Sequence, residues 1–366
     1  MKKLLKMDWA MVAAVFLLTA IGLVFLYSIY SNGKAIGVYT YGSFAKQALA
    51  VFLGILVFLF FSYYDYRALN FFSTKLYFLM LVVLLFVVFA GATVRGTTGW
   101  IKLGIFNIQP VEIAKVVMII FLASFFSQKR TQLSIVVRIL SSIALVFIPV
   151  FLILKQPDFG SAMIIIGVWL VMLLASGINK TNVAKLFLGG AIVLFAGFFL
   201  LKDYQMERLK NFVNPYNDPR GSGYNVIQSM VAVGSGGIFG KGLGHGSQSQ
   251  LNFLPEKHTD FIFAVIAEEG GLVGATVVLA LFSVLLYRVK ETAKLSQDNF
   301  GYLIAIGAMT MFSLHMFINI GMNLGIAPVA GVPLPFLSYG GSSIISFFAV
   351  AGLVQSVWIC RAKTLD

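Results

Sequence analysis

Apolar segments of about 20 residues alternate with shorter polar segments along most of the chain. A helix of about 20 residues crosses roughly 30 Å of hydrocarbon, so each apolar segment is long enough to span a membrane. Membrane-spanning strands would instead give alternating segments of about 10 residues. We therefore expect an all-α polytopic membrane protein whose residues 1–366 form a single domain. The pattern predicts ten spanning helices, at residues 9–29, 45–64, 71–91, 110–127, 138–154, 160–177, 182–201, 261–287, 300–324 and 339–360.

One polar segment is much longer than the others and covers residues 202–260, between the seventh and eighth predicted helices. It begins with charged residues (KDYQMERLK) and continues with a run rich in Pro, Asn and Gly (NPYNDPRGSGYN). A glycine-rich run (VGSGGIFGKGLGHGSQSQ) follows, and the segment closes on LPEKHTDF. A single large polar loop over an apolar bundle indicates that the chemistry takes place where water meets lipid.

The composition agrees with a membrane protein. Hydrophobic residues make up 59% of the chain, charged residues 11%, and the mean hydropathy is +0.91. Soluble domains carry about a quarter charged residues and cannot cover this much apolar surface in one core, so a soluble protein is excluded. The single cysteine, Cys360, excludes a disulfide within the chain and a cysteine-based metal site, and we expect it to face lipid.

Lysine and arginine residues of the short loops lie mostly on one side of the predicted membrane, which marks that side as cytoplasmic. We therefore expect both termini in the cytoplasm and the 202–260 loop outside. The net charge of +13 reflects this bias and an attraction to anionic membrane lipids. Nucleic acid is not an expected partner, because the basic residues are spread over many loops. The cytoplasmic set is Lys2, Lys3, Lys6, Arg67, Lys129, Arg130, Arg138, Lys180, Lys185, Arg288, Lys290, Lys294, Arg361 and Lys363.

Ionisable residues at membrane depth are costly, so each is a candidate functional residue. Glu112 and Lys115 lie three residues apart at the start of the fourth predicted helix, which puts them on one face, where they can pair. They form either a structural ion pair or a polar wall of a substrate cavity. Asp158, between the fifth and sixth helices, either caps the sixth helix or contacts substrate.

Two adjacent carboxylates, Glu268 and Glu269, lie in the eighth predicted helix. Adjacent helical positions diverge by about 100°, so we expect that the two side chains cannot share one partner. At least one must face the bundle interior, either neutral, hydrogen-bonded or paired with a cation such as Lys115.

Asp260 stands at the boundary between the polar loop and the apolar segment FIFAVIA, directly after His258 and Thr259. A carboxylate sheltered by apolar neighbours can act as a general base. The alternative is an N-cap of the eighth helix, and position alone leaves both open. The HTD triplet does not resemble a metal site, because it offers only two ligands.

The glycine-rich run lacks GxxxxGK[ST], which disfavours a soluble nucleotide enzyme. Its backbone N–H groups can still form anion-binding nests. Together with basic residues of the loop, they are expected to hold a membrane-bound pyrophosphate. Those residues are Arg208, Lys210, Arg220, Lys241 and Lys257.

Several long blocks carry a resemblance to a known family. They are NPYNDPRGSGYN with the run that follows it to AEEGG, GTTGWIKLGIFNIQPVEIAK, QPDFGSA and PVAGVPLPFLSYGGSS. In content and order they resemble the SEDS family of RodA, FtsW and SpoVE, membrane proteins of bacterial shape, division and sporulation, with RodA the most similar. The resemblance implies a peptidoglycan glycosyltransferase that polymerises lipid II at the outer face of the bacterial cytoplasmic membrane during cell elongation and shape maintenance.

The resemblance also assigns roles to residues. The family's catalytic aspartate falls on Asp260, which would deprotonate the acceptor 4-hydroxyl while pyrophosphate leaves the donor, giving an inverted β-1,4 linkage. Cations such as Arg208, Lys102 or Lys115 would stabilise the leaving diphosphate. Where the family often shows an arginine before Trp100, this chain has Gly99, and Arg95 is the nearby charge. The full expected substrate-binding set is Trp100, Lys102, Gln109, Glu112, Lys115, Asp158, Arg208, Glu256, His258, Thr259, Ser338 and Tyr339.

The expected partners are lipid II, the nascent glycan strand, membrane lipids and a class B penicillin-binding protein, a transpeptidase. The sequence requires no cofactor, although the resemblance suggests that Mg²⁺ or Mn²⁺ assists. Two other interpretations stay open: a lipid II flippase, which would need a polar path across the membrane, and a non-catalytic scaffold of the cell-wall synthesis complex.

Overall fold

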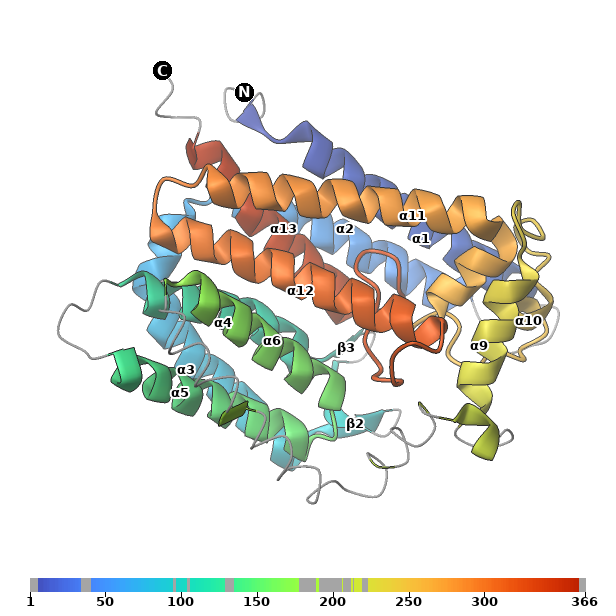
Figure 1. Cartoon of the computed structure of the whole chain (residues 1–366), viewed down its shortest axis with the longest axis horizontal. Coiled ribbons are helices and arrows are strands. Elements are labelled where there is room, and N and C mark those ends of the chain that lie inside the picture. Colours follow the sequence, from blue (N-terminus) through green and yellow to red (C-terminus); the bar gives the residue numbers. More distant parts are fainter. Residues whose placement is uncertain are drawn as a thin grey trace.

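The computed structural model shows a bundle of long apolar helices (Figure 1). It describes residues 6–33, 41–94, 97–103, 106–128, 135–177, 214–218 and 223–361, together with 189–190, 206 and 212. Among these residues, eight helices are long and apolar enough to cross a membrane, and a ninth, α6, is shorter. These nine helices are α1 (Trp9–Gly33), α2 (Tyr41–Tyr63), α3 (Tyr66–Ala90), α4 (Pro110–Ser127), α5 (Ile135–Lys155), α6 (Phe159–Ala175), α11 (Ile262–Lys294), α12 (Asn299–Asn323) and α13 (Gly341–Arg361).

The prediction of a polytopic helical membrane protein is confirmed, and nine of the ten predicted spans coincide with these helices. The seventh, 182–201, falls outside the described residues except for 189–190. The largest difference in bounds is at α11, which continues to Lys294 rather than ending near residue 287. Its last turns carry charged residues that lower the apolar signal, and hydropathy therefore ends the helix too early.

Burial divides the helices into central and peripheral ones. In α4 and in α13, 83% of the spanning window is buried inside the protein, whereas in α2, α3 and α5 the share is 28%. The peripheral helices expose large apolar side chains such as Phe60, Phe71 and Phe89, which suits contact with lipid. Cys360 was expected to face lipid, but it is buried in the bundle, so that prediction is wrong.

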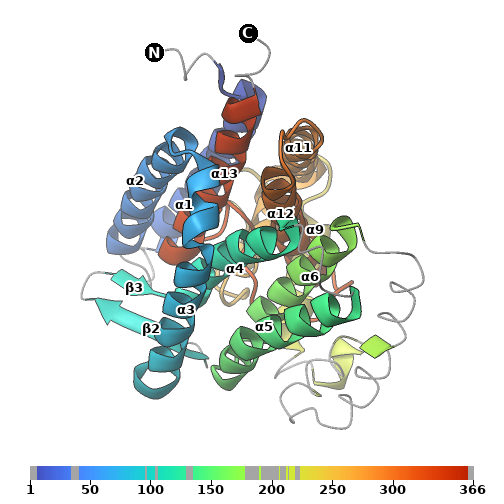
Figure 2. The same cartoon turned by 90° about the vertical axis from the view of Figure 1, so that its left-hand side faces the viewer.

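A small antiparallel sheet was not predicted. Its strands are β1 (Ala92–Val94), β2 (Thr97–Leu103) and β3 (Phe106–Ile108), in the order β1-β2-β3. Trp100 pairs with Ala92 on one side of β2, and Lys102 pairs with Asn107 on the other. The sheet connects the end of α3 to the start of α4, as the end view in Figure 2 shows.

The two ends of the bundle differ in what they carry. Figure 1 shows the N-terminus and C-terminus at the same end, while α9 (Tyr224–Ser235) and α10 (Ser247–Gln250) lie at the other. The starts of α4, α6, α11 and α13 lie toward the end of the bundle away from the termini (Figure 1). The 3₁₀ helix η3 (Pro215–Asn217) precedes α9.

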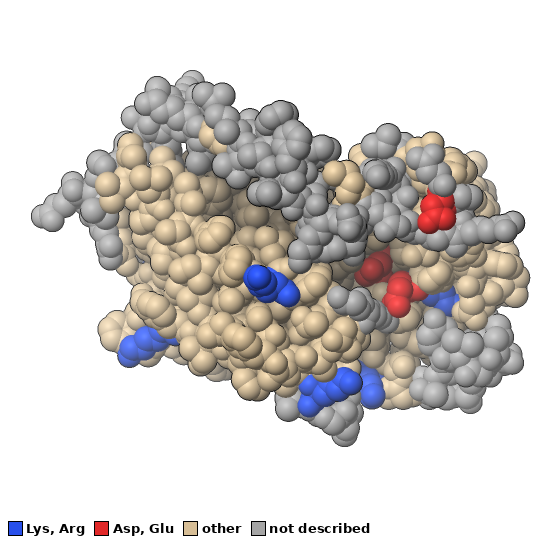
Figure 3. Space-filling view, turned by 90° about the horizontal axis from the view of Figure 1, so that it is seen from below, with Lys and Arg blue, Asp and Glu red and all other residues tan. Residues whose placement is uncertain are grey.

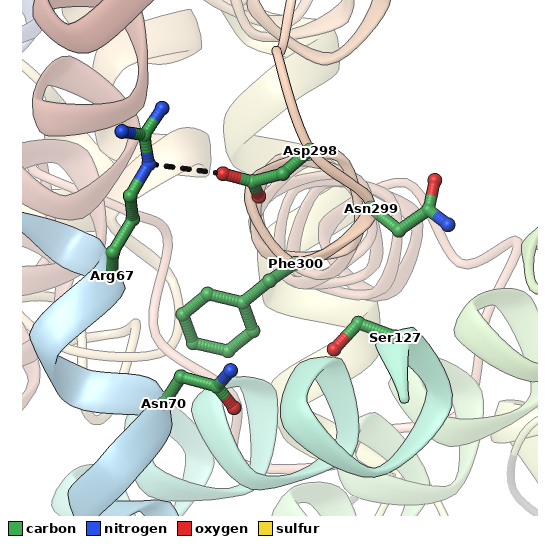
Figure 4. Close-up of a pocket in the computed structure, with 6 residues that line it drawn as sticks. All are labelled: Arg67, Asn70, Ser127, Asp298, Asn299 and Phe300. Carbon is green, nitrogen blue, oxygen red and sulfur yellow. Dashed lines mark hydrogen bonds and ion pairs between the residues drawn. The ribbon is translucent and has the colours of Figure 1, made fainter. Parts of the chain in front are cut away.

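The end with the termini holds an open cavity of about 410 Å³ between α3, α4 and α12 (Figure 4). Arg67 donates to the Asp298 carboxylate at 3.1 Å, and Asp298 also accepts the Tyr66 hydroxyl and caps α12 through the N–H of Gly301. These contacts lock α3 to α12. They lie far along the bundle from the predicted site residues.

Candidate active site

Asp260 lies in the turn that leads into α11, and its backbone is held from α12. Its carbonyl accepts hydrogen bonds from the side-chain amides of Asn319 and Asn323, both at 3.0 Å. The helix starts at Ile262 with Phe261 in the N-cap position, so Asp260 is not the N-cap residue, and that alternative is wrong. The residue is half-buried. The fold therefore fixes the backbone of Asp260 and leaves the residue partly accessible.

Gly331 faces the Asp260 carboxylate from the loop between α12 and α13. It adopts φ +65°, a conformation that side chains disfavour, and a Cβ at this position would lie 3.8 Å from Oδ2 of Asp260. The next residue, Val332, accepts a hydrogen bond from Asn319 at 2.8 Å. Asn319 thus connects the Asp260 backbone to the loop of Gly331 and Val332, which forms a wall of the site.

The PFLSYGG block of the sequence packs directly on the turn before Asp260. The Ser338 hydroxyl donates to the carbonyl of Thr259 at 2.7 Å and accepts from the N–H of Leu334 at 2.8 Å. The N–H of Tyr339 donates to the carbonyl of His258 at 2.8 Å. Predicted site residues that are about 80 positions apart in sequence are therefore neighbours.

An aromatic group covers this junction. The rings of His258 and Tyr339 meet edge to face with centroids 5.5 Å apart, and Tyr30 of α1 lies 6.1 Å from His258 and 6.3 Å from Tyr339. Gln47 of α2 holds the same loop, because its side-chain amide donates to the carbonyl of Ser338 and accepts from the N–H of Gly340. Neither Tyr30 nor Gln47 was predicted from the sequence.

Three polar side chains form a stripe along α12: His315, Asn319 and Asn323, spaced by four residues and all fully buried. Asn323 also accepts from the N–H of Ala264 at 3.0 Å, which connects α12 to the first turn of α11. The i, i+4, i+8 spacing in an otherwise apolar helix was a readable signal, because polar side chains at membrane depth need partners.

Glu112 and Lys115 pair at 2.7 Å, as predicted, and each is only 2% exposed. The Lys115 ammonium also lies 3.3 Å from Nε2 of His315 on α12. The pair is thus enclosed between α4 and α12. Whether it is purely structural or also serves substrate stays a prediction.

The second predicted block collects at the start of α4. Gln109 donates to the Asp158 carboxylate at 3.2 Å, and Asp158 caps α6, as one of its two predicted roles requires. Trp100 is half-buried on β2, where its indole N–H donates to Thr97 at 3.0 Å, and Lys102 on the same strand is exposed. These residues lie at the same end of the bundle as Asp260.

Packing explains why a glycine occupies position 99. A Cβ at this position would lie 2.9 Å from the side-chain oxygen of Gln156, so any side chain would displace that buried amide. Gln156 in turn donates to the carbonyl of Leu84 at 3.3 Å. Arg95, the expected substitute charge, lies outside the described residues.

Glu268 organises the glycine-rich loop from its buried position in α11. Its carboxylate pairs with Lys241 at 2.9 Å and accepts the backbone N–H groups of Gln248 at 2.8 Å and Ser249 at 2.9 Å. The cationic partner is therefore Lys241 and not Lys115. Backbone N–H groups that were expected to hold a phosphate bind this carboxylate instead.

Glu269 binds the same loop and also α1. It accepts from Ser28 at 2.9 Å, from the N–H of Gly244 at 3.1 Å and from Gln250 at 2.6 Å. The Ser249 hydroxyl contacts Glu269 at 3.3 Å while the Ser249 N–H contacts the preceding glutamate. The prediction that the two glutamates cannot share a partner is wrong, because the loop folds back over both.

Lys257 is buried under this loop and donates to the carbonyl of Ser249 and to Asn252. Burial lowers the pKa of Lys257 to about 8, against the opposing effect of the Glu269 and Glu268 carboxylates. Glu256, which has φ +49°, accepts from the Thr259 hydroxyl at 3.1 Å and shapes the turn before Asp260. The predicted Arg208, with Lys210 and Arg220, lies outside the described residues.

On the face shown in Figure 3, the acidic side chains lie toward the end that carries α9 and α10, around and above a hollow with a basic side chain beside it, whereas the other basic side chains are scattered over the face. Within the described part of the chain, no group of three or more His, Cys, Asp or Glu side chains can hold a metal ion. The described residues therefore offer no three-ligand site of this kind, and assistance by Mg²⁺ or Mn²⁺ stays a prediction.

Known proteins share the sequence and the fold of this chain. Residues 8–362 match the family described as cell cycle protein, which comprises FtsW, RodA and SpoVE. The peptidoglycan glycosyltransferase MrdB of Escherichia coli K12 is 42% identical over 295 residues, which cover 77% of this chain and 76% of that protein. Stage V sporulation protein E of Bacillus subtilis 168 is 36% identical over 356 residues, 96% of each chain.

Two solved structures share the fold. One, described as the structural coordination of polymerization and crosslinking by a peptidoglycan synthase complex, is 32% identical with a TM-score of 0.80 and covers 97% of this chain and 98% of that chain. The other, the rod shape determining protein RodA of Thermus thermophilus, is 28% identical with a TM-score of 0.73 and covers 97% of each chain.

Proposed function

The chain belongs to the FtsW/RodA/SpoVE (SEDS) family and is a peptidoglycan glycosyltransferase of cell-wall synthesis, and we propose that it polymerises lipid II with Asp260 as the general base. The observation that carries this proposal is the geometry of Asp260. Its backbone is fixed by Asn319 and Asn323, it is half-buried, and it directly precedes α11, whose start lies at the end of the bundle away from both termini.

The reaction needs a base that is positioned but accessible. Asp260 takes the proton of the acceptor 4-hydroxyl, the oxygen forms a bond to the anomeric carbon of the donor, and the bond to the undecaprenyl pyrophosphate breaks. Displacement from the opposite face inverts that carbon and gives a β-1,4 linkage. One C–O bond forms as another breaks, so the step requires no oxidant, reductant or further reactant.

The neighbouring residues support this role. His258, Thr259, Ser338 and Tyr339 hold the turn before Asp260 through backbone and hydroxyl contacts, so they position the base as well as border the site. The diphosphate needs cationic contacts as it leaves. Exposed Lys102 suits that task better than Lys115, whose charge is already balanced by Glu112 inside the bundle.

The proposed orientation puts the site outside the cytoplasmic membrane. Three residues of the predicted cytoplasmic set, Arg67, Arg288 and Arg361, lie in described helices near the end with the termini, which supports this orientation. A cysteine at Gly246 in a Cys360→Ala background should react with an impermeant thiol reagent on intact cells, and one at Ser296 should not. The reverse pattern would invert the topology.

A penicillin-binding protein of class B is the proposed partner. The similar solved structure comes from a complex that coordinates polymerization with crosslinking. Glycan strands must be crosslinked after polymerisation, and a transpeptidase supplies that step. Co-purification from membranes, compared with a chain of unrelated topology, tests the association.

The decisive experiment gives the purified chain labelled lipid II and analyses glycan strands. Asp260→Asn should fold and bind lipid II but lose about 10²–10⁴-fold in polymerisation, as expected for a missing general base. Asp65→Asn is the matched control, because Asp65 caps α3 at the other end of the bundle and asparagine caps as well. Normal polymerisation by Asp260→Asn would place the base elsewhere. Transport of lipid II without strand formation would favour the flippase interpretation, and a wild-type chain that does neither would favour the scaffold.

A further inference from the structure

His315 of α12 contacts two groups that belong to different parts of the protein. Its Nδ1 lies 2.9 Å from the carbonyl of Pro333, and its Nε2 lies 3.3 Å from the ammonium of Lys115. The side chain is fully buried, and its ring meets Phe347 edge to face with centroids 4.9 Å apart. A buried imidazole with two polar contacts is constrained at both nitrogens.

The partners determine which nitrogen carries the proton. A carbonyl only accepts, so Nδ1 must donate to Pro333. In the neutral ring Nε2 is then an acceptor, and the Lys115 ammonium donates to it and to Glu112 at 2.7 Å. One nitrogen of His315 therefore contacts the buried Glu112–Lys115 pair, and the other holds the carbonyl of Pro333 in place.

That loop carbonyl lies next to the wall of the site. Pro333 follows Val332, whose carbonyl accepts from Asn319, and Gly331, whose Cα faces the Asp260 carboxylate. The N–H of Leu334 donates to Ser338 at 2.8 Å. A shift of Pro333 must therefore move either the glycine that faces Asp260 or the hydroxyl that holds the turn before it.

We propose that His315 is a positioning residue that couples the Glu112–Lys115 pair of α4 to the loop wall facing Asp260. This inference rests on the proposed function of Asp260 as the base. The route runs from Glu112 and Lys115 through His315 to Pro333 and then to Gly331. Each step is a side-chain contact or a link between neighbouring residues of the chain.

The coupling predicts effects on turnover rather than on substrate affinity. His315→Leu keeps an apolar volume but removes both polar contacts, and we expect turnover at saturating lipid II to fall about 10- to 100-fold, because a small displacement of a catalytic group has this effect. KM should stay within about threefold, since the lipid-facing surface is unchanged. His315→Gln can donate to Pro333 and accept from Lys115, so it should retain most of the activity.

Thr310→Val is the matched control. Thr310 is a buried polar residue of the same helix whose hydroxyl bonds only within α12, to the carbonyl of Ile306 at 2.8 Å. Its variant should polymerise normally. A second measurement combines His315→Leu with Glu112→Gln, and coupled residues should give a double variant that loses much less activity than the product of the two single losses.

The outcomes separate the two proposals. If the wild-type chain and His315→Leu polymerise equally, or if the loss appears only in KM, the positioning role is overturned while the proposed function stands. If the wild-type chain makes no glycan, the proposed function itself fails. If His315→Leu does not accumulate, His315→Asn keeps a polar side chain that is too short to reach both partners. A folded His315→Asn with normal turnover overturns the inference, and one with low turnover beside an active His315→Gln supports it.

Discussion

The side chain of Gln109 donates a hydrogen bond to the carboxylate of Asp158 at 3.2 Å and joins the first turn of α4 to the first turn of α6. The other Asp158 oxygen accepts from the N–H of Ser161 at 3.0 Å, so one carboxylate serves two helices. The N–H of Gln109 in turn donates to Ser342 at the start of α13 at 3.0 Å. Three helix starts are therefore tied together at the end of the bundle that carries Asp260.

Substitutions of Asp158 and Gln109 should differ in their effect on the stability of the protein. Asp158→Ala removes the cap of α6 and should lower the free energy of unfolding by about 1 kcal/mol. Gln109→Ala leaves that cap in place, so its melting temperature in detergent should stay close to that of the wild type while polymerisation falls. Equal melting temperatures for Asp158→Ala and Gln109→Ala would show that the cap contributes nothing.

The enclosed Glu112–Lys115 pair predicts a large effect of breaking it from one side. Lys115→Met leaves Glu112 buried without its cation, which typically costs about 3–5 kcal/mol. The double variant with Glu112→Leu removes both charges and should recover most of that stability, as judged by thermal unfolding in detergent. A double variant as unstable as Lys115→Met would mean that the pair is needed for its charges and not only for mutual neutralisation.

Hydropathy alone predicted the membrane class and all nine described spans, because an apolar helix of sufficient length is a local property. The small sheet was missed for the opposite reason. Its strands have three, seven and three residues, and their pairing depends on α3 and α4 meeting at one end of the bundle. No window of sequence contains that information.

The candidate site was predictable where one residue carries a motif and unpredictable where contacts join distant segments. Glu112 and Lys115 pair as expected because their spacing is local. The partner of Glu268 is Lys241, which comes from a loop that folds back over the helix, and helical geometry cannot specify such a loop. The α12 stripe of His315, Asn319 and Asn323 had a readable period, but its partners are set by tertiary packing.

The contacts of Glu268 predict what holds the glycine-rich loop in place. A carboxylate can accept from Lys241 and from two backbone N–H groups, whereas the amide of Glu268→Gln has a single accepting oxygen. We expect amide hydrogens of residues 241–250 to exchange faster in Glu268→Gln, while those of α12 keep their protection. Thr276→Val serves as the control, since the Thr276 hydroxyl bonds within α11. Unchanged exchange in the loop would contradict the anchoring role.

Lys257 predicts a rise of stability with pH. Its pKa in the folded protein is about 8, whereas the unfolded chain keeps the proton up to a pKa of about 10.4. Between these values the unfolded state binds more protons, so the free energy of unfolding rises with pH, and below about pH 8 this contribution is constant. Lys257→Met removes the titration. The melting temperature of the wild type should therefore rise relative to that of Lys257→Met between about pH 7.5 and about pH 9.5. A difference that stays constant with pH would refute the burial argument.

Gly331 offers a test of the space beside Asp260, and Gly177 provides its control. Both adopt positive φ, +65° and +86°, so a change to alanine at either position should cost about 1–2 kcal/mol of stability. They differ in surroundings, because a Cβ at Gly331 would lie 3.8 Å from the Asp260 carboxylate, whereas no atom of the described residues lies within 4 Å of one at Gly177. Gly331→Ala should therefore lower polymerisation by about tenfold or more, and Gly177→Ala should not. If the two variants lose stability and activity alike, backbone strain explains the effect, and the space facing Asp260 is not part of the site.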